Sequence, residues 1–152
     1  MLTPGNKQPT LVLIGATPLA DIMAHGECTY PQECCGLLTG FTNENDELVI
    51  SQAIPSPNIA SGGGLDAFEV DPQVRFDVMR SVEGTDSDIV GHYHSHPDHP
   101  AKPSATDLNL AFEPEFVWLI MAVDKGQAKQ PQAWRLDGET RTSQSLTLTQ
   151  LP

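Results

Sequence analysis

The histidines and the carboxylate between residues 92 and 107 are the part of this sequence best suited to chemistry. Residues 92–97 read HYHSHP, and ten residues separate His96 from Asp107. Side chains on a strand alternate between its two faces, so His94 and His96 project from the same face and can converge on one ion. Two imidazoles and one carboxylate suit zinc, and three protein ligands leave the fourth tetrahedral position open for water. The sequence therefore predicts one Zn²⁺ ion held by His94, His96 and Asp107.

A zinc hydrolase also needs a general base and a donor for the oxyanion. Glu33 comes directly before the apolar run of residues 34–38, which is expected to carry it toward the edge of the sheet. A carboxylate that does not bind the metal can take a proton from the attacking water, so Glu33 is the predicted base. Ser104 could donate a hydrogen bond to the oxyanion that forms on the scissile carbonyl.

Each of these residues also has a structural explanation. Ser104 and Asp107 have the spacing of a capping box, which by itself would account for both. Glu33 could be a solvated surface charge. His92 shares the strand face of His94 and could replace a ligand. A fourth protein ligand, from His92 or a cysteine, would make the site structural rather than catalytic.

Hydrophobic periodicity and turn residues predict the helices and strands that position these side chains. Two helices begin with a capping residue followed by proline, at Thr17-Pro18 and at Asp71-Pro72. Residues 116–122 are uninterrupted apolar, which indicates a central strand covered on both faces. The expected strands are 11–14, 34–40, 48–53, 68–70, 88–95, 116–122 and a closing hairpin that turns at Asp137-Gly138, and the expected helices are 17–28, 72–83 and one that opens at Ser104.

This order of elements predicts an α/β (α+β) fold, with a mixed sheet flanked by helices in one layered domain. A chain of 152 residues can bury a sufficient core without disulfides. We expect a flexible N-terminus at residues 1–10, a domain over residues 11–142, and a final strand or loose tail over residues 143–152.

The charge balance disfavours two classes of partner. The chain has 20 Asp and Glu against 8 Lys and Arg, a net charge of -12. Such a surface repels DNA, RNA and anionic membranes. The three cysteines are odd in number and two are adjacent, so no disulfide framework is expected. The N-terminus lacks a signal pattern and the longest apolar run, residues 116–123, is too short to cross a bilayer, so a cytoplasmic location is expected.

The candidate residues resemble the JAMM (MPN-plus, JAB/PAD-type) metalloprotease family, in its bacterial stand-alone branch. The family pattern is a glutamate, then His-x-His-Pro, then Ser-x-x-Asp, with ten residues between the second histidine and the aspartate. Glu33, residues 94–97, Ser104 and Asp107 match this pattern. Residues 31–40, Asn58, residues 68–72 and residues 134–138 are also similar to bacterial members, so the similarity covers about residues 11–140.

The resemblance implies a curved mixed sheet with packed helices, in a layout like that of the cytidine deaminases. It implies that His94, His96 and Asp107 bind one zinc ion, that Glu33 activates water and that Ser104 steadies the tetrahedral intermediate. The implied activity is hydrolysis of a peptide or isopeptide bond at the C-terminal tail of ubiquitin or a ubiquitin-like protein. For stand-alone bacterial members, the implied substrate is a ubiquitin-like sulfur carrier protein, from whose Gly-Gly tail an extension is removed.

Two other functions are alternatives to this one. The first is a non-catalytic MPN-type scaffold, which the presence of all four key side chains argues against. The second is a nucleoside deaminase, which would need His-x-Glu followed by Pro-Cys-x-x-Cys, and the sequence contains neither. The chain is also short compared with eukaryotic deubiquitinases of the family, so ubiquitin-chain specificity is not expected.

Overall fold

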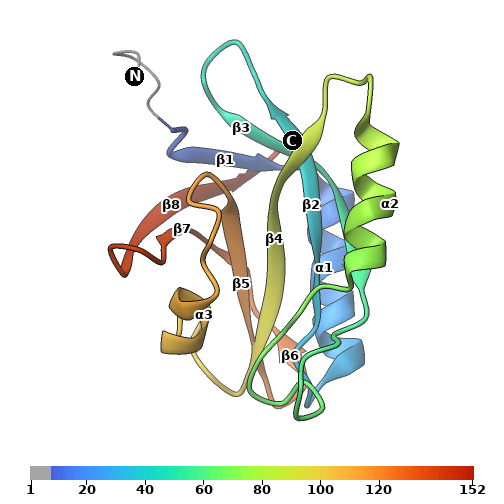
Figure 1. Cartoon of the computed structure of the whole chain (residues 1–152), viewed down its shortest axis with the longest axis vertical. Coiled ribbons are helices and arrows are strands. Elements are labelled where there is room, and N and C mark those ends of the chain that lie inside the picture. Colours follow the sequence, from blue (N-terminus) through green and yellow to red (C-terminus); the bar gives the residue numbers. More distant parts are fainter. Residues whose placement is uncertain (1–7) are drawn as a thin grey trace.

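The computed structural model describes residues 8–152 as three helices and eight strands (Figure 1). We expect residues 1–10 to be flexible, and of these, residues 1–7 lie outside the described part of the chain. In chain order the elements are β1 (Leu11–Ile14), α1 (Ala16–Thr29), β2 (Cys35–Thr42), β3 (Leu48–Ser56), α2 (Pro72–Val82), β4 (Asp88–Pro97), α3 (Ala105–Asn109), β5 (Val117–Asp124), β6 (Gln127–Ala128), β7 (Gln132–Asp137) and β8 (Thr142–Gln150).

All eight strands belong to one mixed sheet that closes on itself. The strand order is β4-β2-β3-β1-β8-β7-β5-β6, and β4 also pairs with β5 in parallel. A circuit of twisted strands has to curve, so this closure explains the curvature of the sheet. A side chain at Gly91 would overlap the backbone carbonyl of Val117, so glycine permits the close approach of β4 and β5. The predicted curved mixed sheet is confirmed.

Side chains from the two faces of the strands pack into two hydrophobic clusters. The first includes Ile22 of α1 and Tyr93 of β4. The second includes Phe68, which precedes α2. Figure 1 shows α1 behind β2 and α2 at the right-hand side of the sheet. β5 contributes Leu119 to the first cluster and Trp118 to the second, so the expectation that this apolar strand is covered on both faces is confirmed.

The capping residue predicted from the sequence is confirmed for α2 but not for α1. Asp71 caps α2 as predicted, because its side chain accepts a hydrogen bond from a backbone amide in the first turn and Pro72 follows. The predicted cap at Thr17 is wrong. Helix α1 begins at Ala16, its N-cap is Gly15, and no side chain bonds to its first turn. The chain enters this helix as soon as it leaves β1, so Thr17 is already helical.

Two predicted strand regions also differ from the structure. Residues 68–70 form no strand, and Val70 makes only an isolated bridge to Asn58. The side chain of Asn58 accepts two backbone hydrogen bonds from its own loop, which holds this segment in an irregular path. The two-residue strand β6 was not predicted, because so short an element has no periodicity. It pairs with β5 after a turn in which Lys125 and Gly126 have positive φ angles.

The last segment of the chain lies in the sheet. Strand β8 pairs antiparallel with β7 and parallel with β1, and it buries Leu146. All three cysteines are free. Within residues 8–152, no helix is long and apolar enough to cross a membrane.

Candidate metal centre

Strand β4 presents both candidate imidazoles on one face, as the alternation of strand side chains predicts. In register, His94 lies between Cys35 of β2 and Ile120 of β5, so the strand is held on both sides. His94 is fully buried and His96 is 8% exposed. Phe68 stacks on the ring of His94, with 4.2 Å between the ring centroids. These contacts hold the imidazole of His94 in one orientation.

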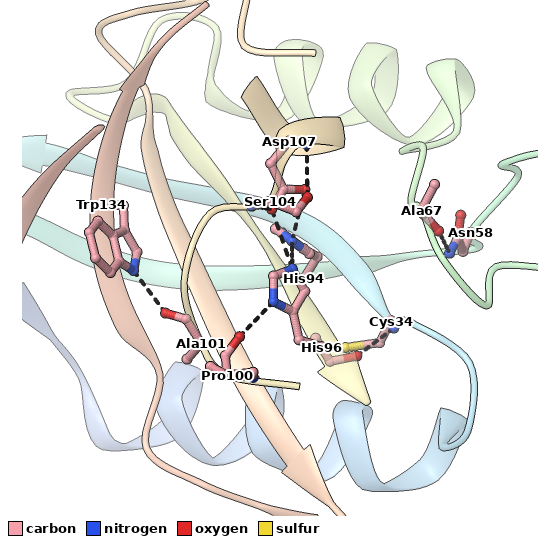
Figure 2. Close-up of polar contacts among 11 residues, drawn as sticks. Cys34, Asn58, Ala67, His94, His96, Pro100, Ala101, Ser104, Asp107 and Trp134 are labelled. Carbon is pink, nitrogen blue, oxygen red and sulfur yellow. Dashed lines mark hydrogen bonds and ion pairs between the residues drawn. The ribbon is translucent and has the colours of Figure 1, made fainter. Parts of the chain in front are cut away.

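The three predicted ligands converge on one point (Figure 2). The Nε2 atoms of His94 and His96 are 2.9 Å apart. The Asp107 carboxylate lies 3.3 Å from both rings, Oδ1 from Nε2 of His94 and Oδ2 from Nε2 of His96. Ligand atoms about 2.0–2.1 Å from a tetrahedral zinc ion are separated from one another by about 3.3 Å. The donor atoms therefore fit a single small divalent cation.

Hydrogen bonding orients the His96 ring. Its Nδ1 lies 2.8 Å from the carbonyl oxygen of Pro100, and because a carbonyl only accepts, Nδ1 carries the proton. When neutral, His96 would present its lone pair at Nε2, toward His94 and Asp107. Burial opposes protonation of this ring, but the hydrogen bonds with Asp107 and with the Pro100 carbonyl raise its pKa, so a cation would have to displace the Nε2 proton. Burial lowers the pKa of His94, which favours its neutral form, the form that binds a metal. Both rings thus direct Nε2 toward the same point.

The first turn of α3 holds Asp107. The backbone N–H of Asp107 donates to Oγ of Ser104 at 3.0 Å, and the backbone N–H of Ser104 donates to Oδ2 of Asp107 at 2.9 Å. The predicted capping box is therefore present. Burial would raise the pKa of Asp107, but hydrogen bonds from His94 and His96 and from the Ser104 amide lower it well below its usual range. Capping and a negative charge at this position are compatible roles of the same carboxylate.

Glu33 lies across the gap from the two imidazoles. One ligand atom from each of Glu33, His94 and His96 lies within 4.8 Å of the others. The residue is 7% exposed, so it is no solvated surface charge. Its backbone N–H donates to the carbonyl of Gly64 at 2.7 Å, and its carbonyl accepts from Asn58 at 3.1 Å. The segment preceding β2 is thereby fixed against the loop between β3 and α2.

Burial gives this carboxyl group the titration range of a base at neutral pH. Desolvation raises the pKa of Glu33 to about 7, against the opposing effect of His96 and with an additional rise from the charge of Asp107. Among the described residues, no side chain forms a hydrogen bond or an ion pair with the Glu33 carboxylate. A carboxyl group with few partners of its own is free to exchange protons with a substrate.

A cavity of about 420 Å³ opens beside these groups. Glu33, His96 and Ser104 all line it, together with Leu65 and Lys102. The structure therefore brings together all five residues singled out from the sequence, with three of them at a cavity large enough for part of a substrate.

The loop between β4 and α3 is tied down at several points, and no pattern in the sequence indicates these contacts. The indole N–H of Trp134 donates to the carbonyl of Ala101 at 3.0 Å (Figure 2). The carboxylate of Asp98 accepts from the Tyr30 hydroxyl at 2.6 Å and from the Lys125 amide at 2.8 Å. These contacts hold the loop that supplies the Pro100 carbonyl to His96.

Ser95 is a further residue whose role is visible only in the structure. Its Oγ accepts from the amide of Cys34 at 2.8 Å, and its own amide donates to the Cys34 carbonyl at 3.1 Å. The residue between the two imidazoles therefore fixes the chain directly after Glu33. In the sequence, only its position between the two histidines could have indicated this role.

His92, the predicted alternative ligand, does not belong to the group of Glu33, His94 and His96 within the described residues. Its ring packs against Trp118, with centroids 4.3 Å apart, and burial lowers its pKa to about 3. It lies beside a second, more apolar cavity of about 540 Å³.

Comparison with known proteins identifies the family. Residues 16–137 match the family described as prokaryotic homologs of the JAB domain. The chain belongs to this family. This agrees with the resemblance read from its motifs.

Individual relatives add to this assignment. The desampylase of Haloferax volcanii is 37% identical over 94 residues, which are 62% of this chain and 65% of the relative. The CysO-cysteine peptidase of Mycobacterium tuberculosis is 26% identical over 126 residues, 83% of each chain. A crystal structure of AF2198, a JAB1/MPN domain protein from Archaeoglobus fulgidus, has a TM-score of 0.55 at 18% identity and covers 90% of this chain and 97% of that one. The last similarity confirms the predicted JAB/MPN-like fold, and the names of the first two agree with the prediction of a peptidase.

Proposed function

We propose that this chain is a zinc-dependent metallopeptidase that hydrolyses a peptide or isopeptide bond at the C-terminal tail of a ubiquitin-like sulfur carrier protein. The observation that carries the proposal is the convergence of His94, His96 and Asp107 within 3.3 Å of one another, beside the buried carboxylate of Glu33. Relatives named as a desampylase and a CysO-cysteine peptidase support this class of activity.

His94, His96 and Asp107 would hold the metal through Nε2, Nε2 and a carboxylate oxygen. Bound zinc would supply a Lewis acid that acidifies water and polarises the scissile carbonyl. The donor set of two neutral imidazoles and one ionised carboxylate fits this ion. The Pro100 carbonyl keeps His96 in the required tautomer.

Glu33 would carry the proton through the reaction. Its carboxylate takes a proton from the attacking water and then delivers this proton to the nitrogen of the leaving amine as the carbon–nitrogen bond breaks. Burial raises the pKa of Glu33 and a bound cation would lower it again, so the group could both accept and release a proton close to neutral pH. The Ser104 hydroxyl accepts from the Asp107 amide, and its own hydrogen remains able to point at the developing oxyanion from the cavity wall.

The test combines metal analysis with cleavage assays on one set of proteins. Sulfur carrier proteins whose Gly-Gly tails bear C-terminal extensions serve as substrates, with and without a chelator. We expect the wild type to contain about one zinc per chain and to cleave only in the absence of chelator. Glu33→Gln should retain the metal but lose turnover, whereas His96→Ala should lose both. Glu139→Gln, at an exposed position outside the cavity, is the control for the loss of a carboxylate.

Two results would contradict the proposal. Near wild-type turnover of Glu33→Gln would remove Glu33 as the base. A wild-type chain that binds no metal and cleaves none of the carriers would instead be a non-catalytic scaffold of the MPN type.

A further inference from the structure

The position of Glu33 identifies which part of the substrate enters the cavity of about 420 Å³, if Glu33 has the role given to it in the proposed function. The leaving amine receives its proton from Glu33, so the leaving group must start beside this carboxylate. Glu33 lines this cavity and does not line the apolar cavity beside His92. The group that departs after the bond is broken therefore occupies the space between Glu33 and the loop of residues 97–104.

One positive side chain faces that space. Lys102 is the only Lys or Arg among the described residues that line the cavity. Within residues 8–152 it forms no ion pair, and its side chain is exposed. Glu33 and Asp66 also line the cavity, and the chain as a whole carries a charge of -12. Apart from the proposed metal, Lys102 is thus the lining group that offsets the charges of Glu33 and Asp66 for an incoming anion.

The backbone that carries Lys102 is held on both sides. The carbonyl of Ala101 accepts from the Trp134 indole, and Ser104 forms the capping box with Asp107. The backbone on both sides of Lys102 is therefore held, and its side chain lines the same cavity as Glu33. Several prolines of the same loop contribute apolar walls to the cavity: Pro97, Pro100 and Pro103.

We propose that Lys102 binds the free α-carboxylate of a single C-terminal amino acid, so that this chain removes one residue from the end of its substrate. The amide carbon–nitrogen bond is broken by one water, and the products are a shortened tail with a new carboxylate and a free amino acid. A lysine side chain in an isopeptide bond has no carboxylate at this position, so it would leave the Lys102 ammonium without a partner. The inference therefore favours a carboxypeptidase over an isopeptidase for the proposed activity.

Three matched substrates test this inference with the zinc-loaded full chain. Each is a ubiquitin-fold carrier protein ending in Gly-Gly: one extended by alanine with a free carboxylate, one extended by alanine amide, and one joined through an isopeptide bond to a lysine peptide. We expect kcat/KM of the wild type to be about tenfold higher for the acid than for the amide, which is the lower end of what one charge-assisted hydrogen bond supplies. The isopeptide substrate should be cleaved more slowly than the acid.

Substitutions assign this preference to Lys102. Lys102→Gln should reduce the ratio of kcat/KM between acid and amide to near one, mainly by slowing cleavage of the acid, and Lys102→Arg should retain the preference. Lys129→Gln removes an exposed lysine that does not line the cavity, so it should keep the wild-type ratio.

The possible failures are distinguishable. An equal rate on acid and amide in the wild type, an unchanged ratio in Lys102→Gln, or faster cleavage of the isopeptide would overturn the role of Lys102 and leave the peptidase assignment in place. Failure to cleave any of the three substrates would overturn both.

Discussion

The buried carboxyl group of Glu33 should make the stability of the metal-free protein depend on pH in a way that Glu33→Gln abolishes. Desolvation is the main cause of its raised pKa, about 7 in the folded chain against 4.5 for the unperturbed group. Glutamine has nearly the same shape and carries no charge. The substitution therefore removes the cost of burying a carboxylate with little change in packing.

The sign follows from proton binding. Between pH 4.5 and pH 7 the folded chain holds the Glu33 proton and the unfolded chain has released it, so the free energy of unfolding falls as pH rises. The contribution is fully present below pH 4.5 and is lost as pH passes through about 7. It amounts to roughly 3 kcal/mol in total, of which about 2 kcal/mol is lost between pH 5.5 and pH 8.

Urea denaturation of chelator-treated wild type and Glu33→Gln at these two pH values measures the effect. The difference in unfolding free energy between the two proteins should change by about 2 kcal/mol in favour of the variant at pH 8. Titrating groups that do not face Glu33 affect both proteins alike and cancel in this comparison. His96, whose pKa the charge of Glu33 raises, does not cancel, so His96→Gln serves as the common background in a second pair of measurements. A difference that stays constant to within roughly 0.5 kcal/mol would show that the folded protein does not bury the charge of Glu33, and the argument for a base tuned by burial would be refuted.

Three further predictions concern activity and the surroundings of the site. The rate of the metal-loaded enzyme should rise about tenfold per pH unit on the acidic side of the Glu33 titration, with a midpoint below 7 in a pH–rate profile, because a bound cation favours the charged carboxylate. Trp134→Phe leaves the Ala101 carbonyl without its donor, so the unfolding free energy should fall by about 1 kcal/mol, and zinc affinity measured by chelator competition should fall because the loop orients His96. Ser104→Ala should lose both the cap and turnover, whereas Ser104→Asp should keep the cap and still lose turnover; an active Ser104→Asp would exclude hydroxyl donation.

The sequence alone predicted those features that depend on neighbours along the chain. His94 and His96 share a face because strand side chains alternate, whatever surrounds the strand. Ser104 and Asp107 cap α3 because their spacing fits the first turn of a helix. The start of α2 followed from Asp71 and the proline after it. The same local reasoning was wrong at Thr17, where the end of β1 and not the capping preference decides the start of the helix.

The tertiary structure alone decided how these local pieces become a site. Closure of the sheet through β4 and β5, the stacking of Phe68 on His94, and the burial of Glu33 under the Gly64 loop join segments that are far apart in the sequence. The hydrogen bond from the Trp134 indole to the loop that carries Lys102 also joins distant segments. Periodicity reports which face a side chain occupies, but the electrostatic environment of that face depends on the residues that fold onto it. For this reason the candidate ligands could be named from the sequence, whereas the raised pKa of Glu33 and the charge of the cavity beside it could not.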